Sequence, residues 1–264
     1  MASFVTEAIV TASRKYGEAD RLITLLTLEK GRLGAIAKSA RKPKSSLRGA
    51  TEPFVRAEFE LAEGKSLDIV RQVEIIDPHL GLRDSWTRLQ LAGHVAEIAN
   101  SMSVERFPDA ALYELVCEAL REISEGQAGA VLRFKAGLLD HMGVFPDLSG
   151  CSNCGSAKVK GDVHLDVKGH GFLCAACAKE KAVYRPVPMK VLYVLHALRN
   201  GDAIPDEGEE IRDVAEDALT VLLQTFLQQG FKTSKAAGQA RSAENRKDHR
   251  NTGKADNKSG RDEA

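Results

Sequence analysis

Residues 151–177 read CSNCGSAKVKGDVHLDVKGHGFLCAAC and contain two matched CxxC pairs. Four thiolates with this spacing can close a tetrahedral Zn²⁺ site. Between the pairs, hydrophobic residues alternate from 162 to 167, which predicts a short hairpin that joins two metal-binding turns. We therefore expect a zinc knuckle with a structural Zn²⁺ at 151–177. Its predicted ligands are Cys151, Cys154, Cys174 and Cys177.

Other roles for these cysteines fit the sequence less well. Disulfide frameworks belong to short secreted chains, whereas this chain has 264 residues and no secretory signal. A redox CxxC opens a helix after a buried strand, and neither pair does so. A catalytic zinc keeps one position open for water, but four thiolates fill all four positions. The fifth cysteine, Cys117, lies on the apolar side of a helical pattern and is expected to be buried.

On both sides of the knuckle, apolar residues recur with the period of an amphipathic helix. Before the knuckle, such stripes lie at 86–102, 112–123 and 131–142, and after it at 188–200 and 211–227. The first stripe begins at Trp86; the last, which ends with Phe226 and Leu227, is wide and strongly apolar, so its helix is expected to be central. We predict an all-α helical domain at 79–150 and 178–233, into which the knuckle is inserted.

The N-terminal part, residues 1–78, has the alternation of β-strands. The five expected strands lie at 3–11, 21–28, 31–38, 54–61 and 66–76. Turn signals separate them, except for one long connection between the third and fourth strands. Five short strands with this spacing suit an oligonucleotide-binding (OB-fold) barrel. An SH3-like barrel is the alternative, because strand pairing cannot be read from the pattern.

The long connection is basic within a neutral protein. The chain has 37 Lys and Arg against 37 Asp and Glu, yet no acidic residue occurs between Lys30 and Ala50. Cations on a loop beside a barrel face can bind a phosphate backbone without reading its sequence. The alternative is a charged loop that contacts only solvent. Aromatic residues are scarce, so base stacking would rest on few candidates, such as Tyr16 or Phe54.

Two further patterns limit the function. From 234 to 264 the chain has no large apolar residue, which predicts a disordered tail. No apolar run approaches the length of a bilayer span, so we expect a cytoplasmic protein without a membrane partner. The sequence also contains no GxxxxGK[ST] phosphate loop, and ATP is therefore not expected to drive its activity.

Several segments together resemble a known family. They are YGEADRLITLLTLEKGRLGAIAKSARKPKSSLRGATEPF at 16–54, LRDSWTRLQLAGHVAEI at 82–98, LRFKAGLLDHMGVFPDLSGCSNCG at 132–155, GFLCAACA at 171–178 and FKTS at 231–234. In sequence and order these segments closely resemble the bacterial RecO family of DNA repair proteins, over residues 3–234. The resemblance implies an OB-fold barrel followed by a helical domain with an inserted four-cysteine zinc knuckle.

The resemblance also implies a function in homologous recombination. A RecO-like protein would bind single-stranded and double-stranded DNA and anneal complementary strands without nucleotide hydrolysis, so it would not be an enzyme. It would engage the C-terminal tail of the single-strand binding protein and, with RecR, help to replace that protein by RecA at gaps in the RecF pathway, close to the nucleoid. The resemblance maps the DNA-binding residues onto Arg32, Lys38, Arg41, Lys42, Lys44 and Arg48. The residues alone leave two alternatives. One is a zinc-containing scaffold that joins proteins without binding DNA, and the other is an enzyme that acts through the cysteines.

Overall fold

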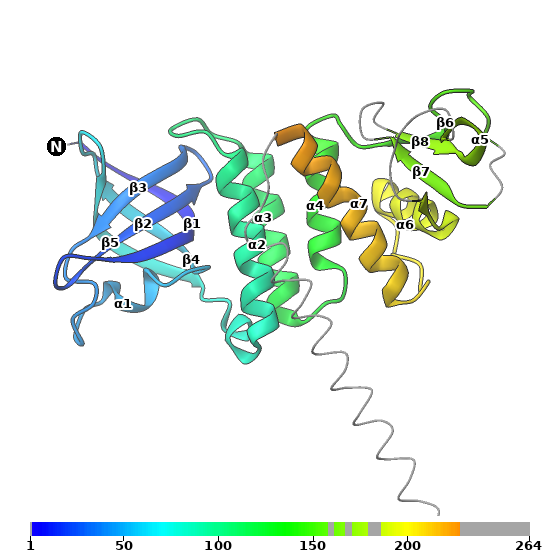
Figure 1. The fold of residues 1–264 in the computed structure, drawn as a ribbon. Helices are drawn as coiled ribbons and strands as arrows, with labels where there is room; N and C mark the ends of the chain where they lie inside the picture. Colours follow the sequence, from blue (N-terminus) through cyan, green and yellow to red (C-terminus); the bar gives the residue numbers. More distant parts are fainter. Residues whose placement is uncertain (1, 158–160, 167–170, 179–185, 228–264) are drawn as a thin grey trace, which may run out of the picture. The chain divides into compact units, whose positions relative to one another are not determined.

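The computed structural model describes residues 2–157, 161–166, 171–178 and 186–227 (Figure 1). The chain divides into two compact units. Of the described residues, 2–108 and 123–126 form the first unit, and 109–122 and 127–227 form the second. The tail predicted to be disordered, at 234–264, lies outside the described residues.

The first unit contains a closed five-stranded barrel, with the strand order β1-β2-β3-β5-β4. Its strands are β1 (Ser3–Tyr16), β2 (Asp20–Thr27), β3 (Gly31–Ala37), β4 (Arg56–Ala62) and β5 (Asp68–Asp77). β3 and β5 are parallel, while the other neighbouring strands are antiparallel. The crossover that places β5 between β3 and β4 gives the Greek-key closure of an OB-fold barrel. The predicted OB-like barrel is therefore confirmed.

Alternation along each strand builds the barrel core. Inward residues such as Leu25, Leu33 and Phe59 are fully buried and pack in one cluster. β1 continues five residues beyond the predicted end at 11. A bulge between Val10 and Ala12 shifts the register there. A bulge breaks the period of two, so the sequence pattern stops where the strand does not.

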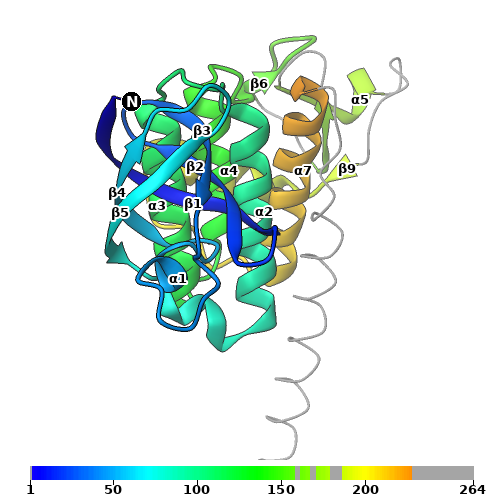
Figure 2. The same ribbon diagram turned by 90° about the vertical axis from the view of Figure 1, so that its left-hand side faces the viewer.

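A short helix that the sequence did not predict, α1 (Leu47–Ala50), ends the basic connection between β3 and β4. It follows Pro43 by several residues, so the proline does not interrupt it. Leu47 and Ala50 are its buried residues, and the helix closes one end of the barrel (Figure 2). The basic segment is therefore anchored to the barrel at its end.

The first unit also contains η1 (Leu80–Asp84) and α2 (Trp86–Met102), which packs against β1. The predicted apolar stripe of α2 is buried from Ala92 to Ala99. Trp86, predicted to belong to that stripe, is instead 72% exposed, so this part of the prediction is wrong. As the first residue of the helix, it precedes the packed stretch by more than one turn.

The segment after α2 completes the barrel wall. β5 pairs with β3 only at Ala35 and Ile36, which leaves the first half of β3 without this neighbour. There Arg32 donates its backbone N–H to the carbonyl of Val104, and Arg106 donates its N–H back to the carbonyl of Arg32. The side chain of Arg106 also pairs with Asp68 at 2.8 Å. Residues 104–106 thus act as a short extra strand beside β3.

The second unit is built on α3 (Ala110–Glu125), α4 (Ala130–His141), α6 (Met189–Asn200) and α7 (Glu209–Leu227). α4, α6 and α7 contact one another. Inside this group, Lys135 is buried and donates to Glu216 at 2.9 Å and to Thr220 at 2.8 Å. The predicted stripe of α7 is buried from Ala215 to Leu223, but its first residues are half-buried and Phe226 is 47% exposed, which corrects the prediction at both helix ends.

A four-stranded sheet in the second unit carries the cysteines, with the strand order β6-β8-β7-β9. Its strands are β6 (Asp147–Cys151), β7 (Val163–Asp166), β8 (Gly171–Cys174) and β9 (Pro186–Val187). β7 and β8 are antiparallel, as the predicted hairpin requires. β6 begins before the predicted knuckle at 151–177, and β9 lies after it. We call β6–β9 with the helix α5 (Ala175–Ala178) the cysteine sheet.

Candidate metal centre and nucleic-acid interface

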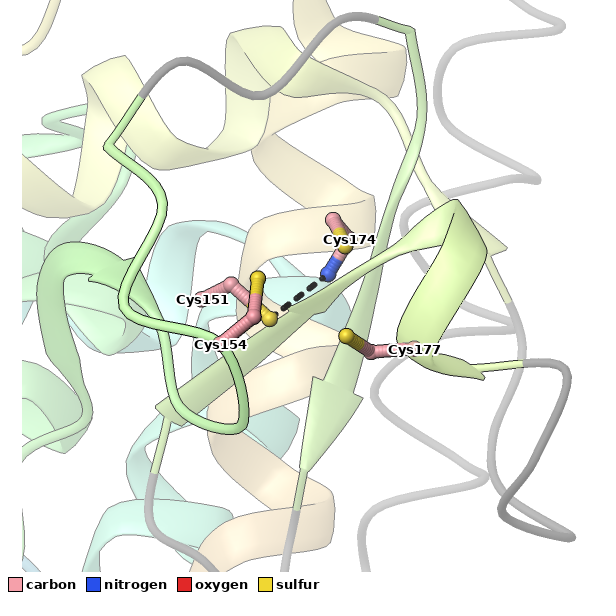
Figure 3. A group of neighbouring side chains, drawn as sticks. All are labelled: Cys151, Cys154, Cys174 and Cys177. Carbon is pink, nitrogen blue, oxygen red and sulfur yellow. Dashed lines mark hydrogen bonds between the residues drawn. The ribbon is translucent and has the colours of Figure 1, made fainter.

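The cysteine sheet brings the four cysteines of both CxxC pairs together (Figure 3). Cys151 ends β6 and Cys174 ends β8, while Cys154 lies in the turn after β6 and Cys177 lies in α5. The prediction that neither CxxC pair opens a helix after a buried strand is therefore wrong for the second pair, because α5 follows the buried strand β8 directly. The convergence of all four cysteines still favours a metal site over a redox pair. The register explains the convergence, because β6 lies beside β8 and Cys151 is paired with Phe172. Gly155, with φ +70°, allows the chain to turn directly after Cys154.

The four sulfur atoms have the spacing that one metal ion needs. All of them lie within 4.8 Å of one another. A tetrahedral Zn²⁺ with Zn–S bonds of about 2.3 Å would place its sulfurs about 3.8 Å apart, so only small movements separate the cluster from metal geometry. Among the described residues, this cluster contains cysteines and no histidine. The donor set is the soft, closed one of a structural metal site.

Hydrogen bonds stabilise negative charge on the sulfur of Cys151. Burial raises the pKa of this thiol, but the N–H groups of Cys154, Cys174 and Asn153 donate to it and bring the pKa down to about 6. The donor from Cys174 lies 3.3 Å from the sulfur. A thiolate held by backbone N–H groups before metal binding is the form that ligates a metal. Cys151 therefore fits a metal ligand in its chemistry as well as in its position. At Cys177 a hydrogen bond from Asn153 lowers the pKa, but hydrogen bonds with the other cysteines and burial raise it to about 12, so a metal ion would have to displace that proton.

Hydrophobic packing holds the centre in place. Cys151 is buried in a small cluster with Leu173 and Ala178. Ser152 donates both its N–H and its hydroxyl to the carbonyl of Phe172, at 2.8 and 3.1 Å, which ties the first CxxC turn to β8. Cys117 lies elsewhere, on α3, and is 7% exposed, so its predicted place as a buried residue is confirmed.

The six predicted phosphate contacts fall into two groups. Four have exposed side chains and follow β3 along the basic connection, and these are Lys38, Lys42, Lys44 and Arg48. The guanidinium of Arg32 instead donates to the carbonyl of Asn100 at 2.7 Å. That of Arg41 donates to the carbonyls of Gly17 and Glu18, at 3.4 and 3.0 Å. Arg32 and Arg41 therefore hold parts of the first unit together.

The basic connection is fixed to the turn between β1 and β2. Arg41 donates its backbone N–H to the carbonyl of Ala19 at 2.8 Å, and Ser39 donates its N–H to Asp20 at 2.7 Å. Ser39 has φ +56°, a left-handed conformation that bends the chain toward this turn. The backbone of the connection is thus fixed to the turn, so the exposed cations are held at a defined place on the barrel.

Two more cations, which the sequence analysis did not single out, lie beside the basic connection. Arg14 and Lys15 are exposed at the end of β1, directly before the turn whose carbonyls accept hydrogen bonds from Arg41. Their neighbour Tyr16 is 49% exposed, and the other predicted stacking candidate, Phe54, is only half-buried with φ +70°. The signal was present in the run RKYG, where two cations precede a glycine turn.

Comparison with known proteins identifies the family. The model described as "Recombination protein O N terminal" matches residues 1–79, which include the barrel, and "Recombination protein O C terminal" matches residues 83–235. The chain belongs to the RecO family. RecO is a family of DNA repair proteins, and recombination and DNA binding are consistent with membership of this family.

Several curated relatives cover most of the chain. The DNA repair protein RecO of Desulforudis audaxviator is 35% identical over 199 residues, which are 75% of this chain and 80% of that protein. That of Bacillus subtilis is 34% identical over 186 residues, 70% of this chain and 71% of the relative. That of Desulforamulus reducens is 30% identical over 229 residues, which are 86% of this chain and 90% of the relative.

Within the described ranges, no helix has the length and apolar character needed to span a bilayer.

Proposed function

We propose that this RecO-family chain binds single-stranded and double-stranded DNA and anneals complementary strands without nucleotide hydrolysis, acting as a recombination mediator and not as an enzyme. The observation that carries the proposal is the exposed cation group Lys38, Lys42, Lys44 and Arg48 on the OB-fold barrel. Hydrogen bonds of the backbone fix the position of this group. Family membership supports the same function.

Annealing by this route needs no catalytic acid, base or nucleophile. Two complementary strands repel each other through their phosphates, and a protein that neutralises both backbones raises their rate of encounter. Contacts to phosphate leave the base edges free to pair. The exposed lysines of the basic connection would supply such contacts, so the feature that matters for annealing is charge and not a pocket.

The proposal extends to partners through the family. We propose that the chain engages the C-terminal tail of the single-strand binding protein and, together with RecR, helps RecA to replace that protein at gaps, with a functional link to RecF. The setting would be the cytoplasm, at the nucleoid. That tail is acidic and ends in apolar residues, so its site would combine an apolar pocket with a cation.

For the metal centre we propose Zn²⁺ with a structural role. Four thiolates complete a tetrahedral sphere and leave no position for a water, so the ion would stabilise the cysteine sheet without taking part in chemistry. The proposed ligands are the four cysteines of the cluster. Metal analysis of the purified protein tests this directly: one zinc per chain supports it, and a redox-active metal or a metal-free, fully stable cluster contradicts it.

The DNA-binding proposal is tested with a labelled oligothymidine and a duplex of equal length. Affinity should fall with salt, with a slope of about 0.7 per phosphate contact on the single strand. The double variant Lys42→Glu/Lys44→Glu should lower affinity for both probes and flatten the slope. Arg71→Glu is the matched control, because Arg71 is exposed on β5 of the same barrel but lies outside the basic connection.

Annealing is then measured with complementary oligonucleotides, naked and coated with single-strand binding protein, in the absence of ATP. Acceleration of both supports a mediator that engages the coat. Acceleration of neither, together with salt-independent or undetectable DNA binding, overturns the proposal and favours a zinc-containing scaffold that joins proteins.

A further inference from the structure

The outer face of the sheet formed by β1, β2 and β3 is only partly covered. Ile9 and Leu26 face each other across β1 and β2 and point away from the barrel core, yet they are 0% and 1% exposed. α2 packs against this part of β1, and Thr11 donates to the side chain of Asn100 at 2.8 Å. The half of the face below α2 is therefore closed to a ligand.

The other half of this face, toward the turn between β1 and β2, is open. Cross-strand pairing places Arg14 opposite Leu22, and Leu22 opposite Ile36, on one side of the sheet. Tyr16 lies two residues after Arg14 and therefore shares its side. Lys38 directly follows β3, at the same end of the sheet. We call these five residues, Arg14, Tyr16, Leu22, Ile36 and Lys38, the open face.

The open face has an apolar centre with an aromatic ring and cations around it. Leu22 and Ile36 are half-buried, while Arg14, Tyr16 and Lys38 are exposed. The acidic groups nearby are Glu18, which is exposed in the turn, and Asp20, whose carboxylate accepts the N–H of Ser39 at 2.7 Å. With Lys42 on the adjoining loop, positive charge predominates.

We propose that the open face seats an unpaired nucleotide, with a base stacked on the ring of Tyr16 and the flanking phosphates near Arg14 and Lys38. An aromatic ring beside cations is the combination that binds single strands without sequence preference. In a duplex both faces of each base are covered by its neighbours, so only an unpaired strand can use the ring. The inference rests on the proposed DNA binding. It adds that Tyr16 gives the protein a higher affinity for single strands than for duplexes.

The roles of the two surfaces then differ. The basic connection, with Lys42 and Lys44, contributes charge that acts on single strands and duplexes alike. Tyr16 contributes stacking, which is independent of salt and acts on unpaired bases alone. Arg41 is a positioning residue, because it donates to carbonyls of the turn that follows Tyr16 and so fixes the ring relative to the loop.

The test compares Tyr16→Leu, Tyr16→Phe and wild type on oligothymidine and on a duplex of equal length. Tyr16→Leu should lower affinity for oligothymidine about 5- to 150-fold, since that is the range for loss of one base–aromatic stack. Affinity for the duplex should change less than 2-fold, the salt slope should stay the same, and Tyr16→Phe should retain wild-type affinity. Tyr193→Leu is the matched control, because Tyr193 is 58% exposed on α6 in the second unit.

A second probe changes the strand. An abasic strand with the same number of phosphates as the oligothymidine should bind wild-type protein about 5- to 150-fold more weakly, and Tyr16→Leu should bind the two strands more nearly alike. Equal losses for Tyr16→Leu on single strand and duplex, or wild-type binding by this variant, would overturn the inference but leave the DNA-binding proposal standing. Failure of the wild type to bind either probe would overturn the proposed function itself.

Discussion

The cysteine sheet and the basic connection both carry a sequence motif, but the fold uses the two motifs in opposite ways. In the cysteine sheet, side chains from two distant CxxC pairs converge, with their sulfurs within 4.8 Å of one another. In the basic connection, the backbone is fixed by hydrogen bonds to the neighbouring turn, while four cationic side chains extend into solvent. The first arrangement should determine stability, and the second should determine binding.

The largest expected effect is on the metal centre. Cys174→Ser removes one of four thiolates and should cost at least about 5 kcal/mol of metal-dependent stability, out of the roughly 10–16 kcal/mol typical of structural zinc sites in peptides. Calorimetry should then show the melting temperature lowered by at least about 10 °C. DNA affinity of the folded protein should stay within 2-fold of wild type.

Cys117→Ala serves as the control for this variant. It also removes a buried thiol, but one outside the cluster, so zinc content should be unchanged. If Cys174→Ser loses DNA affinity while its melting temperature holds, the cysteine sheet is itself a binding surface and the contrast between the two regions fails.

Substitution of a buried lysine in the second unit should destabilise the protein for a different reason. Lys135→Met leaves Glu216 as a buried charge without its ammonium partner and should destabilise the protein by about 3–5 kcal/mol. The double variant Lys135→Met/Glu216→Leu should recover most of this loss, because no buried charge then remains at this place and the hydroxyl of Thr220 still donates to the backbone carbonyl of residue 216. Urea denaturation measures both, and zinc content should stay at the wild-type level. Similar stability of the two variants would show that the ion pair has no such role.

Charge reversal in the basic connection should have a smaller effect on free energy and none on folding. Lys42→Glu/Lys44→Glu replaces two exposed cations and should weaken DNA binding about 10- to 100-fold at low salt, as expected for the loss of several phosphate contacts. Its melting temperature should lie within about 2 °C of wild type, since exposed charges contribute little to stability. A melting temperature that falls with the affinity would mean that these lysines support the fold.

The smallest effect is expected for Arg41→Gln. This residue donates to two backbone carbonyls and is only half-buried, so its loss should cost about 1 kcal/mol of stability. Because Arg41 positions the loop, affinity should fall about 2- to 5-fold while the salt slope keeps its wild-type value. A slope reduced by about 0.7 would instead identify Arg41 as a phosphate contact.

Local patterns predicted much of this molecule. The alternation and turn signals indicated the five strands, and the CxxC spacing indicated the cluster of Cys151, Cys154, Cys174 and Cys177. The parts that could not be predicted depend on contacts between distant residues. Residues 104–106 complete the barrel wall beside Arg32, and nothing in their composition indicates a strand. The same holds for the carbonyl partners of Arg32 and Arg41, which a count of charges does not reveal.

The bulge between Val10 and Ala12 shows how a local pattern can also mislead. It interrupts the alternation at the point where the sequence prediction ended the strand, and it hid the fact that Arg14 and Tyr16 still belong to β1. Trp86 was misplaced for a related reason, because an apolar residue at helical spacing was assigned to the core although it lies in the first turn.

The most direct test measures melting temperature and oligothymidine affinity together for wild type, Cys174→Ser and Lys42→Glu/Lys44→Glu. We predict that Cys174→Ser loses stability and keeps affinity, whereas Lys42→Glu/Lys44→Glu loses affinity and keeps stability. Loss of both properties in parallel by the two variants would contradict this, because the metal centre and the DNA-binding surface would then not be separable.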